Sequence, residues 1–107
     1  MGKKESKRPP KATDVLTLAR SSVERGTYRD TRHAVERKEE RGITLLEILQ
    51  VIRRGHHEKR KDEFKPQYGA WNYAIRGKTI DQRELRVVVA FVQGMLVITA
   101  IDLRVRD

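Results

Sequence analysis

The chain contains no cysteine and no long apolar run, and both absences exclude classes of protein. Without cysteine there are no disulfide bonds and no thiolate metal ligands, which fits a reducing compartment without proving one. No run of about eighteen apolar residues occurs, so the sequence predicts no transmembrane helix. The N-terminus is basic but lacks the apolar segment of a secretory signal. We therefore expect a cytoplasmic protein that does not associate with a membrane.

The sequence also lacks the common signatures of cofactor-dependent and hydrolytic enzymes. It has no glycine-rich phosphate loop, no dinucleotide-binding fingerprint and no nucleophile elbow. His56 and His57 have Glu58, Asp62 and Glu63 nearby, but neighbouring strand residues point to opposite faces and no two-histidine metal motif is present. This pattern favours an exposed polar edge over a metal site. Neither a metal nor a cofactor is predicted.

What the chain does have is positive charge. Its 107 residues include 24 Lys and Arg against 15 Asp and Glu, a formal net charge of +9. Residues 1–65 hold 18 of these basic and 11 of the acidic residues, so most of the excess precedes the apolar C-terminal part. A strongly basic chain is attracted to polyanions: nucleic acid, an anionic membrane or an acidic protein.

The length fits one small domain. Residues 1–12 have no apolar periodicity and contain two prolines, so we expect a disordered basic tail rather than an arm that grips phosphate. Residues 13–107 then form the single predicted domain. Within it, a weakly amphipathic helix is expected after Thr13 and Asp14, ending at Gly26. A second helix over residues 31–41 carries little apolar surface and needs neighbours or a ligand to be stable.

The third predicted helix has the strongest signals. Thr44 and Glu47 have capping-box spacing, and Ile43 and Ile48 can form a hydrophobic staple. Gly55 follows two arginines that suit the negative end of the helix dipole. An apolar stripe at helical spacing predicts the face that packs on the core; it comprises Leu45, Ile48, Leu49 and Ile52, widened by Leu46 and Val51.

Strand patterns dominate the rest. Residues 56–65 read as a charged edge strand or a loop, and residues 71–78 alternate with period two. Residues 85–92 are apolar on both faces, as in a central strand, and Gln93-Gly94 forms a tight turn before a strand over 95–103. The predicted fold is α+β, with two to three N-terminal helices packed on one face of a three- to four-stranded antiparallel sheet.

Two groups of residues are candidates for function. His33, Arg37 and Arg41 recur at four-residue spacing and form one stripe along their helix, where guanidinium groups can hold phosphates. The alternative is that the arginines merely pair with glutamates of the same helix. The second group combines cations with aromatic side chains, the usual combination for single-stranded RNA. It comprises Arg60, Lys61, Lys65, Asn72, Arg76 and Lys78, with Phe64, Tyr68, Trp71 and Tyr73. Trp71 fits a core position better, and Tyr73 fits either role.

A family resemblance joins these groups. The pattern H-A-x-x-R-x-x-x-R-G-I-T at 33–44, W-N-Y-A-I-R-G at 71–77, L-R-V-V-V-A at 85–90 and V-I-T-A at 97–100 resembles a small bacterial, toxin-like domain family of unknown function, over about residues 27–102. The order of elements and the Trp71-Asn72 pair are similar to the MqsR group of RelE-like ribonuclease toxins. The resemblance implies a type II toxin that cuts mRNA, on the ribosome or free, and is neutralised by a cognate antitoxin.

Catalytic residues of that group carry over only in part. Lys61 or Arg60 matches its strand lysine, and Asn72 matches its glutamine. The tyrosine has no counterpart in residues 85–88, and Asp102 or Arg104 stands near the place of the late basic residue. These departures shift the expected chemistry towards the helix at 31–41.

The sequence thus predicts a metal-independent endoribonuclease in which the 2′-OH attacks the neighbouring phosphate, with a non-catalytic RNA-binding or antitoxin-binding module as the alternative. His33 is the expected proton-transfer group. The predicted catalytic set is His33, Arg37, Arg41, Arg60, Lys61, Asn72 and Arg76, and the predicted RNA-binding set is Arg32, Lys59, Tyr73 and Lys78.

Overall fold

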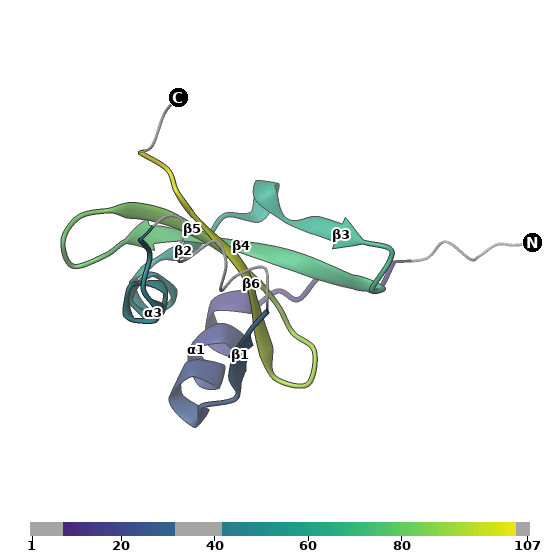
Figure 1. Cartoon of the computed structure of the whole chain (residues 1–107). Helices are drawn as coiled ribbons and strands as arrows, with labels where there is room; N and C mark the ends of the chain where they lie inside the picture. The colour runs from purple at the N-terminus through teal and green to yellow at the C-terminus, as the bar shows by residue number, and fades with distance from the viewer. Residues whose placement is uncertain (1–7, 32–41, 105–107) are drawn as a thin grey trace, which may run out of the picture.

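A computed structural model describes residues 8–31 and 42–104 of the chain, and Figure 1 shows the arrangement of its elements. In chain order these are helix α1 (Val15–Arg25), strand β1 (Tyr28–Asp30), helix α3 (Leu45–Arg54), strand β2 (His56–His57), the 3₁₀ turn η1 (Lys59–Lys61), and strands β3 (Glu63–Lys65), β4 (Ala70–Lys78), β5 (Glu84–Ala90) and β6 (Met95–Asp102). The predicted helix over 31–41 lies almost wholly outside the described residues and stays a prediction.

The strands form one mixed sheet in the order β1-β6-β5-β4-β2, and β3 pairs with the first part of β4. β1 runs parallel to β6, whereas every other pair is antiparallel. The α+β class is therefore confirmed, but the predicted sheet of three to four strands was too small, since six strands lie in the described residues. β1, β2 and β3 have two or three residues each, and such short strands carry no readable period.

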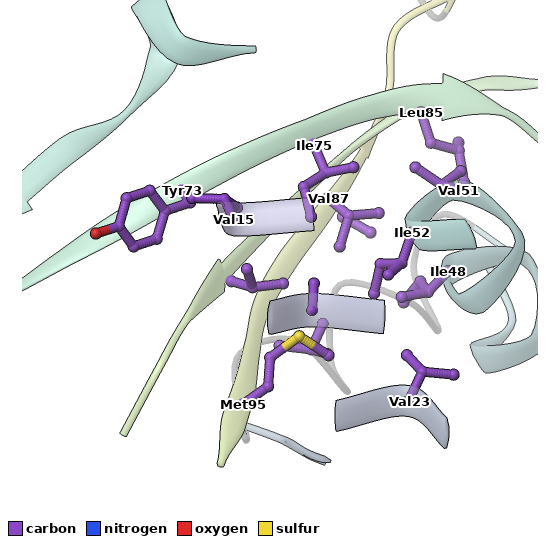
Figure 2. Close-up of a cluster of buried hydrophobic side chains, with 14 of the residues drawn as sticks. Val15, Val23, Ile48, Val51, Ile52, Tyr73, Ile75, Leu85, Val87 and Met95 are labelled. Atoms are coloured by element: carbon purple, nitrogen blue, oxygen red, sulfur yellow. The ribbon is translucent and has the colours of Figure 1, made fainter. Parts of the chain in front are cut away.

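Both described helices lie on the same side of the sheet, and Figure 1 shows α1 and α3 together beneath β4 and β5. Odd-numbered residues of β4 and β5 point to this side, among them Ile75, Val87 and Val89, each 0% exposed. Figure 2 shows Ile75 and Val87 on the side of the sheet where Ile48 and Ile52 of α3 lie. Burial of apolar side chains between helices and sheet is the main stabilising contribution to this arrangement.

α3 begins as the sequence predicts, and the predicted apolar stripe faces inward in part. The capping box is present: the Thr44 side chain accepts from the Glu47 N–H at 3.2 Å, and the Thr44 N–H donates to Glu47 Oε1 at 2.9 Å. Ile48, Val51 and Ile52 are fully buried, whereas Leu45 is 37% and Leu46 61% exposed. The predicted stripe therefore wrongly included Leu45 and Leu46, because periodicity alone does not show where the sheet meets the helix.

A close glycine contact sets α3 against β4. A Cβ atom on Gly55 would lie 2.4 Å from the Arg76 carbonyl oxygen, and one on Gly77 would lie 2.8 Å from the Gly55 Cα. Neither position has room for a side chain, so the end of the helix and the strand meet backbone to backbone. Arg20 of α1 then donates to the carbonyl oxygens of Ile52 and Gly55, which lie at the helix end.

The turns follow the predicted chemistry. Gly26 has φ +71° and ends α1, and Gln93 and Gly94 both have positive φ in the tight turn between β5 and β6. A Cβ on Gly94 would lie 2.5 Å from the Thr27 carbonyl oxygen, so glycine is needed there for space as well as for φ. Within the described residues, no helix is long and apolar enough to cross a membrane.

Candidate functional site

One of the two predicted groups cannot be placed. Arg32, His33, Arg37 and Arg41 lie outside the described residues, so their proposed roles stay predictions. The second group lies on and beside β4, within the described part of the chain.

Even-numbered residues of β4 and β5 point to the face of the sheet that is not covered by α1 and α3. Register pairs Arg76 with Arg86 and Lys78 with Glu84 across the two strands. Adjacent β2 pairs His56 with Arg76, which puts the imidazole on the same face. β5 was predicted to be apolar on both faces, but Arg86 interrupts its outer side and is only partly buried. We call this side the open face.

Glu58 organises the charges of the open face. It is 7% exposed and holds two guanidinium groups: Arg86 donates to its carboxylate at 2.7 and 3.2 Å, and Arg76 at 3.3 Å. Arg76 also donates to Glu84 at 2.7 Å. The Glu58 N–H donates to the Ala74 carbonyl oxygen at 2.8 Å, so the backbone itself brings this carboxylate over β4.

These contacts shift the protonation of the carboxyl groups. Hydrogen bonds and charge from Arg86, joined by Arg76, lower the pKa of Glu58 from 4.5 to about 2, against the opposing effect of burial. The hydrogen bond from Arg76 likewise lowers the pKa of Glu84. Both groups are therefore carboxylates at neutral pH, and their negative charge offsets much of the positive charge of the two arginines.

A shallow depression lies beside this network, at the β2 edge of the open face. It is lined by His56, His57, Glu58, Lys59, Arg60, Arg76 and Glu84. η1 brings Lys59 and Arg60 to its rim, where both are exposed, as is Lys61 beside them. In the described part of the chain, none of these three side chains has an ion-pair partner, in contrast to Arg76. Their charges are free to meet an anion.

The two adjacent histidines diverge, as the strand period predicts. His56 is exposed at the depression, whereas the His57 side chain is 9% exposed and its Nε2 lies 2.9 Å from the Asp62 carboxylate. His57 also packs edge-on against Tyr73, with ring centroids 5.8 Å apart. No cluster of metal-ligating side chains occurs among residues 8–31 and 42–104.

The remaining predicted residues are scattered. Asn72 points to the open face but is 7% exposed and does not line the depression. Its buried Oδ1 has no hydrogen-bond partner among the described residues. Lys78 is exposed further along β4. Tyr73 points to the helix side and is 5% exposed, so its ring is unavailable for stacking on a base. The structure thus brings together Lys59, Arg60 and Arg76, with Lys61 adjacent, and separates Asn72 and Tyr73 from them.

Sequence reasoning did not assign a site role to four groups: His56, Glu58, Glu84 and Arg86. A signal existed for two of them, because Glu84 and Arg86 alternate on β5 in the manner of charged partners for Arg76 and Lys78 on β4. Glu58 had no such signal, since its position depends on the turn of the chain between β2 and η1.

Residues 31–102 match the model of a family described as Domain of unknown function (DUF4258). The match spans more than half of the chain. The protein belongs to this family. This agrees with the predicted small family of unknown function. No curated protein and no solved structure gives a significant match.

The family's description assigns no activity, so chemistry must be argued from the depression. Exposed lysine and arginine side chains at its rim can bind phosphate oxygens, the arginine with two parallel hydrogen bonds. The exposed imidazole of His56 beside them is a candidate for proton transfer to or from a substrate. The arrangement suits a polyanion better than a neutral ligand.

Proposed function

We propose that the protein is a toxin-like endoribonuclease that cuts RNA without a metal ion and is held in check by an antitoxin in the cytoplasm. The observation that carries the proposal is the depression in which Lys59 and Arg60, free of described ion-pair partners, adjoin His56 and Arg76. The formal net charge of +9 favours association with RNA. The sequence resemblance to MqsR- and RelE-like ribonuclease toxins supports the same activity.

In the proposed reaction, the scissile phosphate binds at Arg60 and Arg76. A base removes the proton of the neighbouring 2′-OH, whose oxygen attacks phosphorus. The bond to the 5′-oxygen breaks, that oxygen takes up a proton, and a 2′,3′-cyclic phosphate remains. Cationic side chains stabilise the charge that develops on the phosphate oxygens. The candidates for proton transfer are His56 at the depression and His33 from the sequence pattern.

The test is cleavage of a labelled RNA by purified protein in the presence of EDTA. We expect cleavage to persist, and Arg60→Ala to lower its rate about a hundredfold if this side chain stabilises the transition state. Arg29→Ala is the matched control, because Arg29 is also an exposed arginine but belongs to β1 at the opposite edge of the sheet. Cleavage that needs an added divalent ion, or equal losses in both variants, contradicts the proposal.

Single substitutions of the two histidines then separate the proton-transfer candidates. If His56 acts on the substrate, His56→Ala loses cleavage and keeps RNA affinity; if His33 acts, the loss follows His33→Ala. Retention of full activity in both variants is inconsistent with imidazole catalysis. Arrest of host growth by the protein, relieved by co-expression of a candidate antitoxin, tests the toxin assignment independently of the nuclease assay.

A non-catalytic RNA-binding or antitoxin-binding module is the second candidate, and the ion pairs of Arg76 favour it. Its guanidinium is committed to Glu58 and Glu84, so binding phosphate requires exchange of these partners. A binding module shows RNA affinity that falls steeply with salt, without cleavage. In that case Arg60→Ala reduces the slope of log affinity against log salt by about one, equally for all sequences.

A further inference from the structure

Residues Arg8–Ala12, part of the predicted basic tail, lie across β3 and β4 on the helix side of the sheet. We call these five residues the strap. Trp71 donates its indole N–H to the Pro9 carbonyl oxygen at 2.8 Å, and the Ala12 N–H donates to the Tyr73 hydroxyl at 2.9 Å. A hollow beside the strap is lined by Pro9 and Pro10 of the strap as well as by Trp71 and Tyr73. We call the surface that the strap covers, formed by Asp62, Phe64, Trp71 and Tyr73, the groove. This part of the segment therefore belongs to the folded structure.

An ion pair and cation–π contacts also hold the strap in place. Lys11 Nζ lies 2.7 Å from Asp62 and 5.2 Å from the centre of the Trp71 ring. The Arg8 guanidinium lies over both Phe64 and Trp71, at 5.2 and 5.7 Å from the ring centres. These distances are those of cation–π contacts. The strap thus contributes two cations to a surface of two aromatic rings and one carboxylate.

The contacts are those by which proteins recognise extended proline-containing peptides. A tryptophan N–H reaches a peptide carbonyl beside proline, aromatic rings line the groove, and a carboxylate binds a basic side chain. Only Lys11 contributes a charged side chain to Asp62; the two hydrogen bonds use the main chain of the strap. Any segment with two prolines followed by lysine can present the same groups.

Asp62 makes this groove selective for a cation. Its side chain is 1% exposed, accepts from the Ala74 N–H at 3.0 Å, and contacts both His57 and Lys11. A carboxylate buried this deeply is costly without a positive partner, so the groove favours a basic occupant. The same carboxylate repels phosphate, which disfavours RNA stacking on Trp71 in this groove.

From these observations we propose that the groove over β3 and β4 is a binding site for an extended, basic, proline-containing peptide, and that the strap is its occupant in cis. A partner segment with the chemistry Pro-Pro-Lys competes for the groove once the strap is released. The groove and the depression lie on opposite faces of the sheet, because Trp71 and Tyr73 point to the helix side whereas Arg76 points to the open face. His57 and Lys59 border both: each lines the depression, while His57 contacts Asp62 and the Lys59 carbonyl oxygen accepts from Lys11. The proposal does not depend on ribonuclease activity.

Trp71 is the only tryptophan of the chain, so its fluorescence reports on the groove directly. In the full-length Lys11→Glu variant, repulsion from Asp62 should release the strap. We expect the constant for acrylamide quenching of Trp71 to rise about twofold or more, as in a local opening, while far-UV circular dichroism stays unchanged. Lys11→Met removes the charge but keeps the stem, and it carries the test if Lys11→Glu does not fold.

A synthetic peptide of residues 8–14 (RPPKATD) is then added to the variant. We expect saturable return of Trp71 shielding with this peptide, and none with a control peptide that has glutamate in place of the lysine. Three results overturn the proposal. They are unchanged quenching of Trp71 in the Lys11 variants, no return of Trp71 shielding with the peptide at millimolar concentration, and return of shielding with a short single-stranded RNA instead. The quenching of Trp71 does not depend on whether the wild-type chain cleaves RNA. Failure of the peptide proposal would therefore not imply failure of the ribonuclease proposal, or the reverse.

Discussion

Val87 and Arg86 are neighbours on β5, yet they belong to two differently stabilised faces of the same sheet. Val87 is fully buried beneath the helices, where apolar contacts with α1 and α3 hold the layers together. Arg86 lies on the open face and is held by the Glu58 carboxylate at 2.7 Å. The helix face depends on close packing and shape, and the open face on a few charged hydrogen bonds, so they should respond to different perturbations.

The largest effect is expected on the helix face. Ile48→Ala removes a fully buried side chain of α3 and leaves a cavity against the sheet, which should cost about 3 kcal/mol of unfolding free energy. Leu46→Ala, on the same helix but 61% exposed, is the control and should cost less than about 0.5 kcal/mol. Urea denaturation of both variants measures the difference. Equal losses would mean that α3 does not pack through the face described here.

The open face should be the more sensitive to acid. Because the pKa of Glu58 is lowered from 4.5 to about 2, its contribution to stability is present above pH 4.5 and is lost as the pH falls towards 2. Linkage gives a loss of about 2 kcal/mol between neutral pH and pH 3 from this group alone. Urea midpoints measured across this range should fall with pH in the wild type.

Glu58→Gln removes this pH-dependent contribution and leaves Arg76 and Arg86 without their shared carboxylate. The variant should be less stable at pH 7 by about 2 kcal/mol and should lose less stability between pH 7 and pH 3. Glu24→Gln changes an exposed glutamate of α1 and should preserve the wild-type pH profile. An unchanged profile in Glu58→Gln would show that other carboxyl groups carry the acid sensitivity.

The smallest effect is expected at the N-terminal cap of α3, which belongs to neither face of the sheet. Thr44→Ala removes the oxygen that caps α3 and should cost about 1 kcal/mol. Thr17→Ala, at an exposed position inside α1, makes the same chemical change without a cap and should be neutral or slightly stabilising. If thermal denaturation shows the same shift for both, the cap does not contribute in solution.

The sequence predictions succeeded where the structure depends on residues close together in the chain, and were less successful where it depends on contacts between distant segments. The capping box, the end of α1 at Gly26 and the Gln93-Gly94 turn depend on residues adjacent in the chain, and the structure confirms all three. The inward face of α3 and strand β1 depend on contacts distant in sequence; the first was predicted only in part and the second was missed. Residues 56–65, predicted as an edge strand or a loop, contain β2 at the edge of the sheet and β3. The same holds for the candidate site. The sequence was enough to name Arg60 and Arg76 as site residues, but it did not indicate the Glu58 carboxylate between Arg76 and Arg86.

The sequence alone was sufficient for the α+β class, the boundaries of α3, the long strands and the basic character, because period, capping and charge are local properties of the chain. Only the tertiary structure decided which residues of different segments share a face. The β2–η1 turn places Glu58 over β4, and pairing of β3 with β4 builds the surface that the strap covers. These placements result from hydrogen-bond register and packing between distant segments, which no single segment encodes.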